Sequence, residues 1–356
     1  MALPLTETVH AETAPERGLI GLKYLDYLDS QPGNDRIRVK SPAVIALVPI
    51  SSDWSVGGTL TSDVISGASP AYHTTALRNM HDRRRAGDAD VTRYFPNGTL
   101  TFGAYLSSEA DYLSRGLSVQ GTVSSEDKNT TWAMGLGVNR DVINPVNHIV
   151  DHETKRVANM LLGLTQVLTT RDIVQLNLSQ SLGRGYYSDP YKVYDERPRD
   201  RNITTMLARW NHYVEAFEGT ARFSYRYYSD SWSIKAHTMG VEYVQPLPNG
   251  WAVTPSMRLY TQSAASFYVD ADASRFPFPP NPPAGAVNYS EDQRVSAFGG
   301  RTLGVKVAKQ LDADWLVDVK VEHYAQRAAW RMFGSGSPGL APFNARMIQV
   351  GLSRQF

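Results

Sequence analysis

The sequence predicts an all-β protein, a transmembrane antiparallel β-barrel of about sixteen strands with short periplasmic turns and long extracellular loops. Three observations lead to this prediction. Apolar and polar residues alternate along almost the whole chain, every second connection between the alternating segments is very short, and the chain ends on an aromatic residue. We expect residues 1–17 to be a flexible N-terminal segment and residues 18–356 to form one barrel.

The composition limits the class of protein. The chain has 356 residues, a net charge of +1, no cysteine and a mean hydropathy of −0.34. A near-zero net charge argues against a nucleic-acid partner, because nucleic-acid-binding proteins usually carry a basic excess. The longest uninterrupted apolar stretch is 43–50, whereas a membrane-spanning helix needs roughly 20 apolar residues. The lack of cysteine favours export through an oxidising periplasm. We therefore expect a mature exported form whose start Met replaces a signal peptide.

Period-two alternation marks the strands. Within 131–138, Trp132, Met134, Leu136 and Val138 alternate with smaller residues, and similar alternation occurs at 174–179, 221–228 and 315–322. Because successive side chains of a strand point to opposite faces, each segment has one apolar face. A soluble β-sandwich also alternates, so this pattern alone does not give the location.

The lengths of the connections separate these two possibilities. Every second connection is short, at 51–53, 96–98, 126–129, 169–171, 218–219, 248–250 and 312–314. Most of the others are long, at roughly 64–88, 142–152, 185–201, 266–297 and 332–342. Outer-membrane barrels have short periplasmic turns and long extracellular loops. The sequence therefore predicts a protein of the bacterial outer membrane.

The C-terminal segment supports this location. Ile348, Val350 and Leu352 share one face with the terminal Phe356. This resembles the aromatic-ended strand by which outer-membrane barrels are recognised for assembly, and an ordinary edge strand is the alternative. We expect aromatic residues at strand ends to form interfacial girdles. They are Tyr24, Trp54, Trp132, Trp232, Trp251, Trp315 and Trp330.

Charged residues within the strands predict the lining of a lumen. At about sixteen strands the interior is too wide for side chains to fill, so we expect an aqueous lumen unless loops close it. Ionised groups are costly against hydrocarbon and should therefore point inwards. The predicted pore-lining residues are Arg209, Arg222, Arg226, Arg258, Lys306, Asp318, Lys320 and Glu322. Their basic majority would weakly favour anions, and the alternative is a mutually paired wall without selectivity.

Two further segments carry charge. The loop expected at 64–88 contains Arg83, Arg84 and Arg85. It either contacts lipopolysaccharide phosphates or folds inwards to hold an anionic group. The hairpin 107–115 brings together Glu109, Asp111 and Arg115, which could hold a cation or form a turn salt bridge. Because the chain has no phosphate-binding loop, nucleophile elbow or zincin motif, we expect neither an enzyme nor a metal site.

Several segments resemble the recurring blocks of a known family. They are DRIRVKSPAVIALVP, DVISGASP, SSEADYLSR, DKNTTW and SYRYYSDSW. The resemblance is to an uncharacterised bacterial outer-membrane barrel family, the domain of unknown function 3570, and covers roughly residues 18–356. It implies a gene neighbourhood with a flavin transferase, a small lipoprotein and thioredoxin-like proteins.

The resemblance also implies a flavin site. DVISGAS looks like the acceptor motif of that transferase, Asp-x-x-Ser/Thr-Gly-Ala-Thr, whose last hydroxyl carries FMN in phosphoester linkage. The matching residues are Asp63, Ser66, Gly67 and Ala68, with Ser69 in place of the usual Thr. In this hypothesis Arg83, Arg84 and Arg85 neutralise the flavin phosphate. The alternative is a simple turn that follows a strand.

Three functions remain open at this point. The first is a channel, and the second is a barrel linked to flavin-based electron transfer across the outer membrane. The third is a non-conducting scaffold that docks a small lipoprotein or a periplasmic redox protein. All three place the barrel among outer-membrane lipid and lipopolysaccharide.

Overall fold

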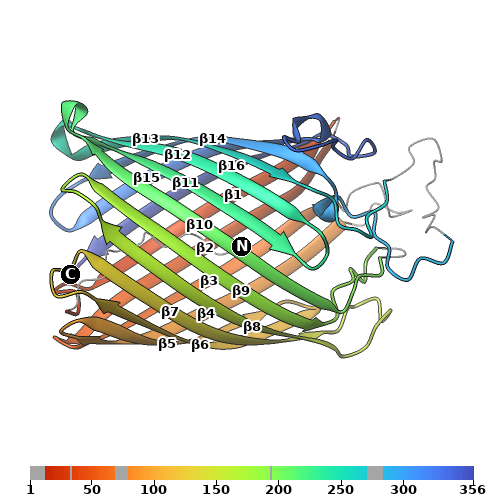
Figure 1. Cartoon of the computed structure of the whole chain (residues 1–356), viewed down its shortest axis with the longest axis horizontal. Helices are drawn as coiled ribbons and strands as arrows, with labels where there is room; N and C mark the ends of the chain where they lie inside the picture. The colour runs from red at the N-terminus through yellow and green to blue at the C-terminus, as the bar shows by residue number, and fades with distance from the viewer. Residues whose placement is uncertain (1–12, 33, 69–78, 193–194, 271–283) are drawn as a thin grey trace.

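The computed structural model describes residues 13–32, 34–68, 79–192, 195–270 and 284–356. Sixteen antiparallel strands form one closed barrel, in which each strand pairs with its neighbours in the chain and the last strand pairs with the first. Figure 1 shows the strands crossing the long axis of the barrel obliquely, as closure of a barrel requires. The predicted fold class, strand number and antiparallel order are confirmed.

The strands are β1 Leu19–Gln31, β2 Asn34–Ser51, β3 Trp54–Ala68, β4 Asn79–Phe95, β5 Gly98–Ser108, β6 Tyr112–Ser124, β7 Thr130–Ile143, β8 Glu153–Val167, β9 Asp172–Gly185, β10 Asp200–Val214, β11 Gly219–Asp230, β12 Lys235–Leu247, β13 Trp251–Gln262, β14 Phe298–Gln310, β15 Trp315–Arg327 and β16 Phe343–Gln355. Short 3-10 turns occur at η1 Glu215–Phe217, η2 Pro248–Gly250, η3 Gln293–Val295 and η4 Ala328–Trp330. No helix in the described ranges is long and apolar enough to cross a membrane.

The connections divide between two rims (Figure 1). The short-turn rim holds the connections 52–53, 96–97, 125–129, 168–171, 215–218, 248–250 and 311–314. The long-loop rim holds the connections 144–152, 186–199, 263–297 and 328–342, together with the short hairpins 109–111 and 231–234. The lengths are sorted between the rims largely as the sequence predicts.

The first long loop is shorter than predicted. β3 continues to Ala68 and β4 begins at Asn79, so most of the predicted loop 64–88 is paired strand. Where a strand extends beyond the apolar belt, both of its faces can be polar, so hydropathy does not mark its end. Arg83, Arg84 and Arg85 therefore belong to β4 and not to a loop.

The outer face of the barrel is an apolar belt. Leu22 of β1, Val44 of β2 and Leu60 of β3 stand in register, and they are 51%, 40% and 66% exposed. Alternate residues of β7, from Trp132 to Val138, are exposed in the same way. A contiguous apolar surface is costly in water, since each Å² exposed forgoes roughly 25 cal/mol of burial energy. This face is therefore suited to hydrocarbon.

The inner face is recognised from contacts that pass over an intervening strand. The Asn139 amide of β7 donates to the Tyr105 hydroxyl of β5 at 2.7 Å. The Lys155 ammonium of β8 donates to the Tyr112 hydroxyl of β6 at 2.8 Å. Side chains from strands once removed meet only on the concave side, and these residues alternate with the exposed apolar ones. The inner face is therefore polar.

Aromatic rings on the inner face lie against glycines of neighbouring strands. The Tyr105 ring covers Gly116 of β6 so closely that a Cβ added there would lie 2.9 Å from Tyr105 Cδ1. The Tyr105 hydroxyl is also hydrogen-bonded to Ser114 at 2.6 Å. Only glycine leaves room for this ring, which is thereby fixed on the wall of the barrel.

Two of the predicted girdle residues, Trp232 and Trp330, lie at the long-loop rim, whereas Trp54, Trp132, Trp251 and Trp315 lie at the short-turn rim. Trp54 and Trp251 are exposed at the short-turn rim, and the cations of Arg93 and Lys309 stand 5.4 and 5.2 Å from their ring centroids. Trp232 is not a girdle residue. It lies in the 231–234 hairpin of the long-loop rim and is 1% exposed.

Trp232 is the centre of a folded cap. We define the cap as the described residues of 186–199, 231–234 and 263–297. Its apolar cluster consists of Trp232, Ile234, Ala265, Phe267 and Val295, with Tyr187, Tyr228 and Tyr268 packed around it. Because Tyr228 is an inward residue of β11, the cap packs against the inner edge of the long-loop rim.

An ion network holds the cap loops together. The Asp292 carboxylate is fully buried and accepts from Arg197 at 2.7 Å, with Lys192 at 3.0 Å. Arg294 Nε also donates to it at 2.7 Å. Asp189 and Asp195 balance the remaining charge through Arg294 and Arg197. The 186–199 and 263–297 loops are therefore joined by three cations and three carboxylates.

The N-terminal segment predicted to be flexible is described only from residue 13. The Ala14 amide donates to the Ser52 carbonyl at 3.0 Å, and Arg17 forms an ion pair with Asp314. These contacts attach residues 14–17 to the short-turn rim.

Candidate functional site: the lumen and the long-loop rim

The eight predicted pore-lining residues lie on the inner face of β10, β11 and β13–β15. On each of these strands the exposed apolar residues occupy the alternate positions, as Phe223 and Tyr225 do around Arg222 and Arg226. The eight are Arg209, Arg222, Arg226, Arg258, Lys306, Asp318, Lys320 and Glu322.

Three of these arginines are exposed although they point into the barrel. Arg222, Arg226 and Arg258 all have exposed side chains, and neither Arg222 nor Arg226 forms a hydrogen bond or ion pair with a described residue. Arg258 donates to the Thr302 hydroxyl at 3.2 Å. Solvent therefore reaches the inner wall at their level, and the described side chains do not fill it.

Other members of the set are partly neutralised. Lys320 forms an ion pair with Glu322 at 3.1 Å on β15. Arg209 donates to Gln175 of β9 at 3.1 Å. Glu242 of β12, which was not predicted, is paired in register with Arg222, but the two side chains form no ion pair. The basic character of this wall is therefore carried mainly by Arg222, Arg226 and Arg258.

The opposite wall is acidic. Asp88 and Asp90 alternate with Ala89 and the exposed Val91, which places both carboxylates on the inner face of β4. In a closed barrel of sixteen strands β4 lies across from β12, midway between β11 and β13. Asp88 is seven residues from the short-turn end of β4, as Arg226 is on β11 and Arg258 on β13. A carboxylate thus faces two guanidinium groups across the lumen.

Sequence reasoning missed this acidic wall because residues up to 88 were assigned to a loop. The signal was present in the alternation of Asp88 and Asp90 with Ala89 and Val91. Between the charged walls, β6–β9 contribute small neutral side chains, including Ser118, Gln120, Asn159, Asn177 and Ser179.

Nearer the long-loop rim, inward carboxylates are paired with cations. The Asp141 carboxylate forms an ion pair with Lys155 at 3.1 Å and accepts a hydrogen bond from the Ser114 hydroxyl at 2.6 Å. Asp230 receives Arg201 at 2.8 Å. Asp63 receives Arg84 Nε at 2.6 Å. These pairs are fixed parts of the wall and contribute little net charge.

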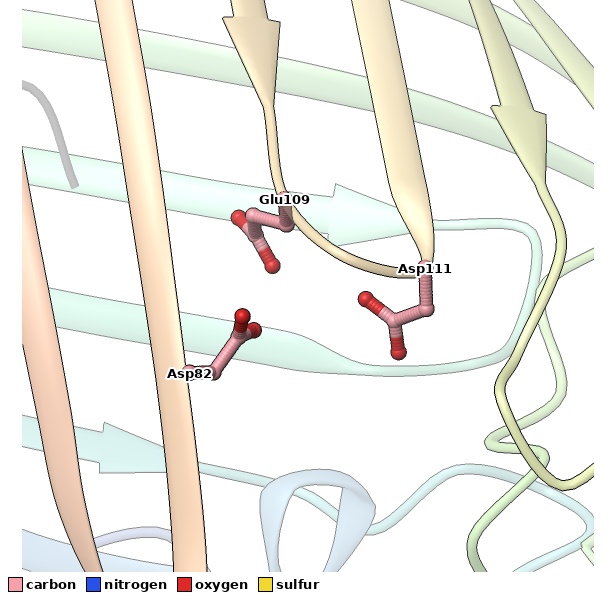
Figure 2. Close-up of side chains that lie close together, drawn as sticks. All are labelled: Asp82, Glu109 and Asp111. Atoms are coloured by element: carbon pink, nitrogen blue, oxygen red, sulfur yellow. The ribbon is translucent and has the colours of Figure 1, made fainter.

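A cluster of three carboxylates lies at the same rim (Figure 2). Asp82 of β4 and Glu109 and Asp111 of the β5–β6 hairpin each offer an oxygen within 4.8 Å of the others. Burial, followed by repulsion from Asp82 and Asp111, raises the pKa of the Glu109 carboxyl. Oxygen ligands of this kind suit hard cations. Arg115, which the sequence placed with Glu109 and Asp111, points to the outer face instead.

The flavin motif is only partly described. Its residues Asp63, Ser66, Gly67 and Ala68 belong to the last part of β3. Ser69, the expected acceptor, lies outside the described residues, so attachment of FMN stays a prediction.

The arginines expected to hold the flavin phosphate do not converge. Arg84 points inwards to Asp63, whereas Arg83 and Arg85 stand opposite Val64 and Ser62 on the outer face. The expectation of a joint site is wrong because neighbouring residues of a strand point to opposite faces.

Solved structures show the same fold at low sequence identity. A bacterial polysaccharide outer membrane secretin has a TM-score of 0.53 at 9% identity, with 95% of this chain and 98% of that chain covered. CdiB from Acinetobacter baumannii has a TM-score of 0.52 at 8% identity, with 93% and 60% covered. These likenesses concern the fold alone.

Among sequences, no curated protein matches the chain. The family model "Protein of unknown function (DUF3570)" matches residues 72–347. That match spans most of the barrel, from the connection before β4 to within β16, and agrees with the resemblance seen in the sequence. The chain therefore belongs to the DUF3570 family, and its own structure is a closed barrel of sixteen strands.

Proposed function

We propose that the protein is a non-enzymatic channel of the bacterial outer membrane that passes small hydrophilic solutes and prefers anions. The short turns face the periplasm and the long loops face the exterior, as in other barrels with this division. The observation that carries the proposal is the set of exposed, inward-pointing side chains of Arg222, Arg226 and Arg258, with Asp88 on the opposite wall.

The physical basis is the field inside a narrow aqueous lumen. Charges of one sign on a low-dielectric wall raise the local concentration of counter-ions. Arg222 and Arg226 make no ion pair with a described residue, so their charge is available to passing anions. The opposing carboxylate of Asp88 creates an electric field across the lumen. This field orients solutes that carry both a positive and a negative group. Selectivity then arises from the lining of the lumen rather than from one binding site.

The test is ion selectivity in a planar bilayer. The wild type should show a reversal potential in a KCl gradient that indicates preference for chloride. Replacing Arg222, Arg226 and Arg258 together by Gln should reduce that preference or reverse it, because three positive charges leave the wall. Arg140→Gln on the outer face is the matched control and should leave selectivity unchanged. Equal selectivity of the triple variant and the wild type would contradict the proposal.

We propose a second function, flavin-linked electron transfer, on the acceptor motif. It is supported by the match of Asp63, Ser66, Gly67 and Ala68 to the acceptor motif. The intact mass of protein from native membranes, compared with a Ser69→Ala variant, tests it. A mass excess equal to FMN that disappears in the variant supports the proposal, and an unmodified wild-type mass removes it.

The scaffold function remains the alternative to both. In that case the barrel docks a small lipoprotein or a periplasmic redox protein and conducts little. A stably co-purifying partner together with the absence of current would favour it over the channel.

A further inference from the structure

Four arginines stand side by side on the outer face of four neighbouring strands. Arg115 of β6 pairs in register with Arg140 of β7, Arg140 pairs with Arg156 of β8, and Arg156 pairs with Arg184 of β9. Neighbouring strands are about 4.8 Å apart, so the row is roughly 15 Å wide. We call these four residues the arginine row.

The arginine row lies on the face that carries the apolar belt. The outward neighbours one step towards the short-turn rim are all apolar, namely Leu117, Val138, Ala158 and Leu182. Each arginine is within four residues of the long-loop end of its strand. The row therefore runs along the border where the apolar belt approaches the long-loop rim.

The charge of the arginine row is not neutralised by the protein. All four side chains are exposed. Arg115, Arg140 and Arg156 form no hydrogen bond or ion pair with any residue that the structure describes, and Arg184 has only Asp200, at 3.5 Å. Like charges directly opposite one another on a sheet are destabilising. Four cations in this arrangement call for anions from outside the chain.

We propose that the arginine row binds the phosphate groups of lipopolysaccharide in the outer leaflet. Guanidinium groups pair with phosphate through two parallel hydrogen bonds, and such pairs are stronger where water is partly excluded. The apolar neighbours meet the acyl chains of the same lipid molecule, so charge and apolar surface match one amphiphile at one border. A free phosphate ion would satisfy the arginines but not the apolar residues beneath them.

The site does not depend on the proposed channel function, because it concerns the outer face and not the lumen. It adds a second position to the one expected from the sequence. The expectation placed contacts with lipopolysaccharide on Arg83, Arg84 and Arg85, whereas the longer row lies on β6–β9.

The experiment compares lipid retention by the folded barrel in detergent. Purified lipopolysaccharide, its enzymatically dephosphorylated form and inorganic phosphate are offered to the wild type and to the variant in which Arg115, Arg140 and Arg156 are Gln. The wild type should retain lipopolysaccharide and lose it as salt is raised. The variant should bind it at least about tenfold more weakly, because three charge-assisted contacts are removed.

Arg346→Gln is the matched control, because Arg346 is also exposed, outward-facing and the fourth residue of a strand that starts at the long-loop rim. It should retain lipopolysaccharide nearly as the wild type does. Equal retention by the triple variant and the wild type, or an equal loss in the control, would overturn the proposal. So would undiminished binding of the dephosphorylated lipid by the wild type, a result that does not depend on folding of any variant. Competition by inorganic phosphate alone at similar concentrations would show a simple anion site and likewise overturn it.

Discussion

The Tyr191 hydroxyl donates a hydrogen bond of 2.8 Å to the Asp111 carboxylate. Tyr191 belongs to the β9–β10 loop and Asp111 to the β5–β6 hairpin, so this contact passes over the β7–β8 connection. The same loop rests on that connection, where the Asn147 amide donates to the Pro190 carbonyl at 2.8 Å. One edge of the cap is thereby attached to the acidic cluster.

We predict that Tyr191→Phe loosens the β9–β10 loop without unfolding the barrel. A hydrogen bond to a charged acceptor is worth about 1.5–3 kcal/mol, and the partly exposed position of Tyr191 puts this one at the low end. Amide hydrogen exchange in residues 186–192 should become faster, while exchange in the strands stays unchanged. Unaltered exchange in the loop would show that the contact does not hold it.

Repulsion within the acidic cluster predicts a pH effect. Because the pKa of Glu109 is raised in the folded state, its contribution to stability is complete below the ordinary carboxyl pKa and is lost as the pH rises through the folded value. Glu109→Gln should therefore stabilise the protein at pH 7 relative to pH 4, by on the order of 0.5 kcal/mol after screening by solvent.

Thermal denaturation in detergent at the two pH values measures this effect. Glu126→Gln, in an exposed short turn, is the control and should show no such difference. A larger stabilisation by Glu109→Gln at pH 4 than at pH 7 would have the wrong sign and would contradict the assignment.

The ion network of the cap predicts a loss of stability in Asp292→Asn. Burial alone would raise the pKa of Asp292, but Arg294, Lys192 and Arg197 hold it well below its usual range. The substitution leaves three cations without their shared carboxylate, and breaking a buried ion pair costs about 3–5 kcal/mol.

Limited proteolysis of the long loops checks this prediction. Asp292→Asn should be cleaved within the cap faster than the wild type. Asp151→Asn should not, because Asp151 is exposed and, among the described residues, is paired with His152 alone. The stabilisation by Asp292 should also be lost on acidification, because its folded pKa is depressed. Equal cleavage rates of the Asp292 variant and the wild type would show that the network does not hold the loops.

Close packing of the Tyr105 ring on Gly116 predicts that adding one methyl group at residue 116 lowers the stability of the barrel. Gly116→Ala should destabilise the barrel by about 1–3 kcal/mol, because the ring or the strand must shift. Gly137→Ala, also on the inner face, is the matched variant. Its added Cβ would lie 3.6 Å from the nearest atom, the Leu117 carbonyl oxygen, so it should fold with little loss of stability. Urea unfolding in detergent compares the two, and an equal effect would argue against the packing.

The sequence predicted the barrel because its determinants are local. Alternation such as that from Trp132 to Val138 indicates which face meets hydrocarbon. The length of a connection indicates at which rim of the barrel it lies. The same logic placed Arg222 and Arg226 on the inner face. It failed for Arg83, Arg84 and Arg85, because β4 extends into a polar region where hydropathy no longer marks a strand.

Features that depend on register or loop packing could not be predicted. Trp232 is buried by Phe267 and Tyr187, which are distant from it in sequence. Its position at a strand end therefore predicts a girdle residue, and the sequence gives no sign of the burial. The pairing of Arg115 with Arg140 requires the register of β6 with β7, and the opposition of Asp88 to Arg226 requires closure of the barrel. No single segment of sequence contains these relationships.

We propose that the lumen conducts, with Arg222 and Arg226 of β11 and Arg258 of β13 facing the acidic wall of β4. The most direct measurement is the current through single purified barrels in a planar bilayer separating unequal KCl solutions. We predict discrete current steps and a reversal potential whose sign indicates a preference for chloride over potassium. Properly inserted barrels that give no current steps, or that prefer potassium, would contradict the claim.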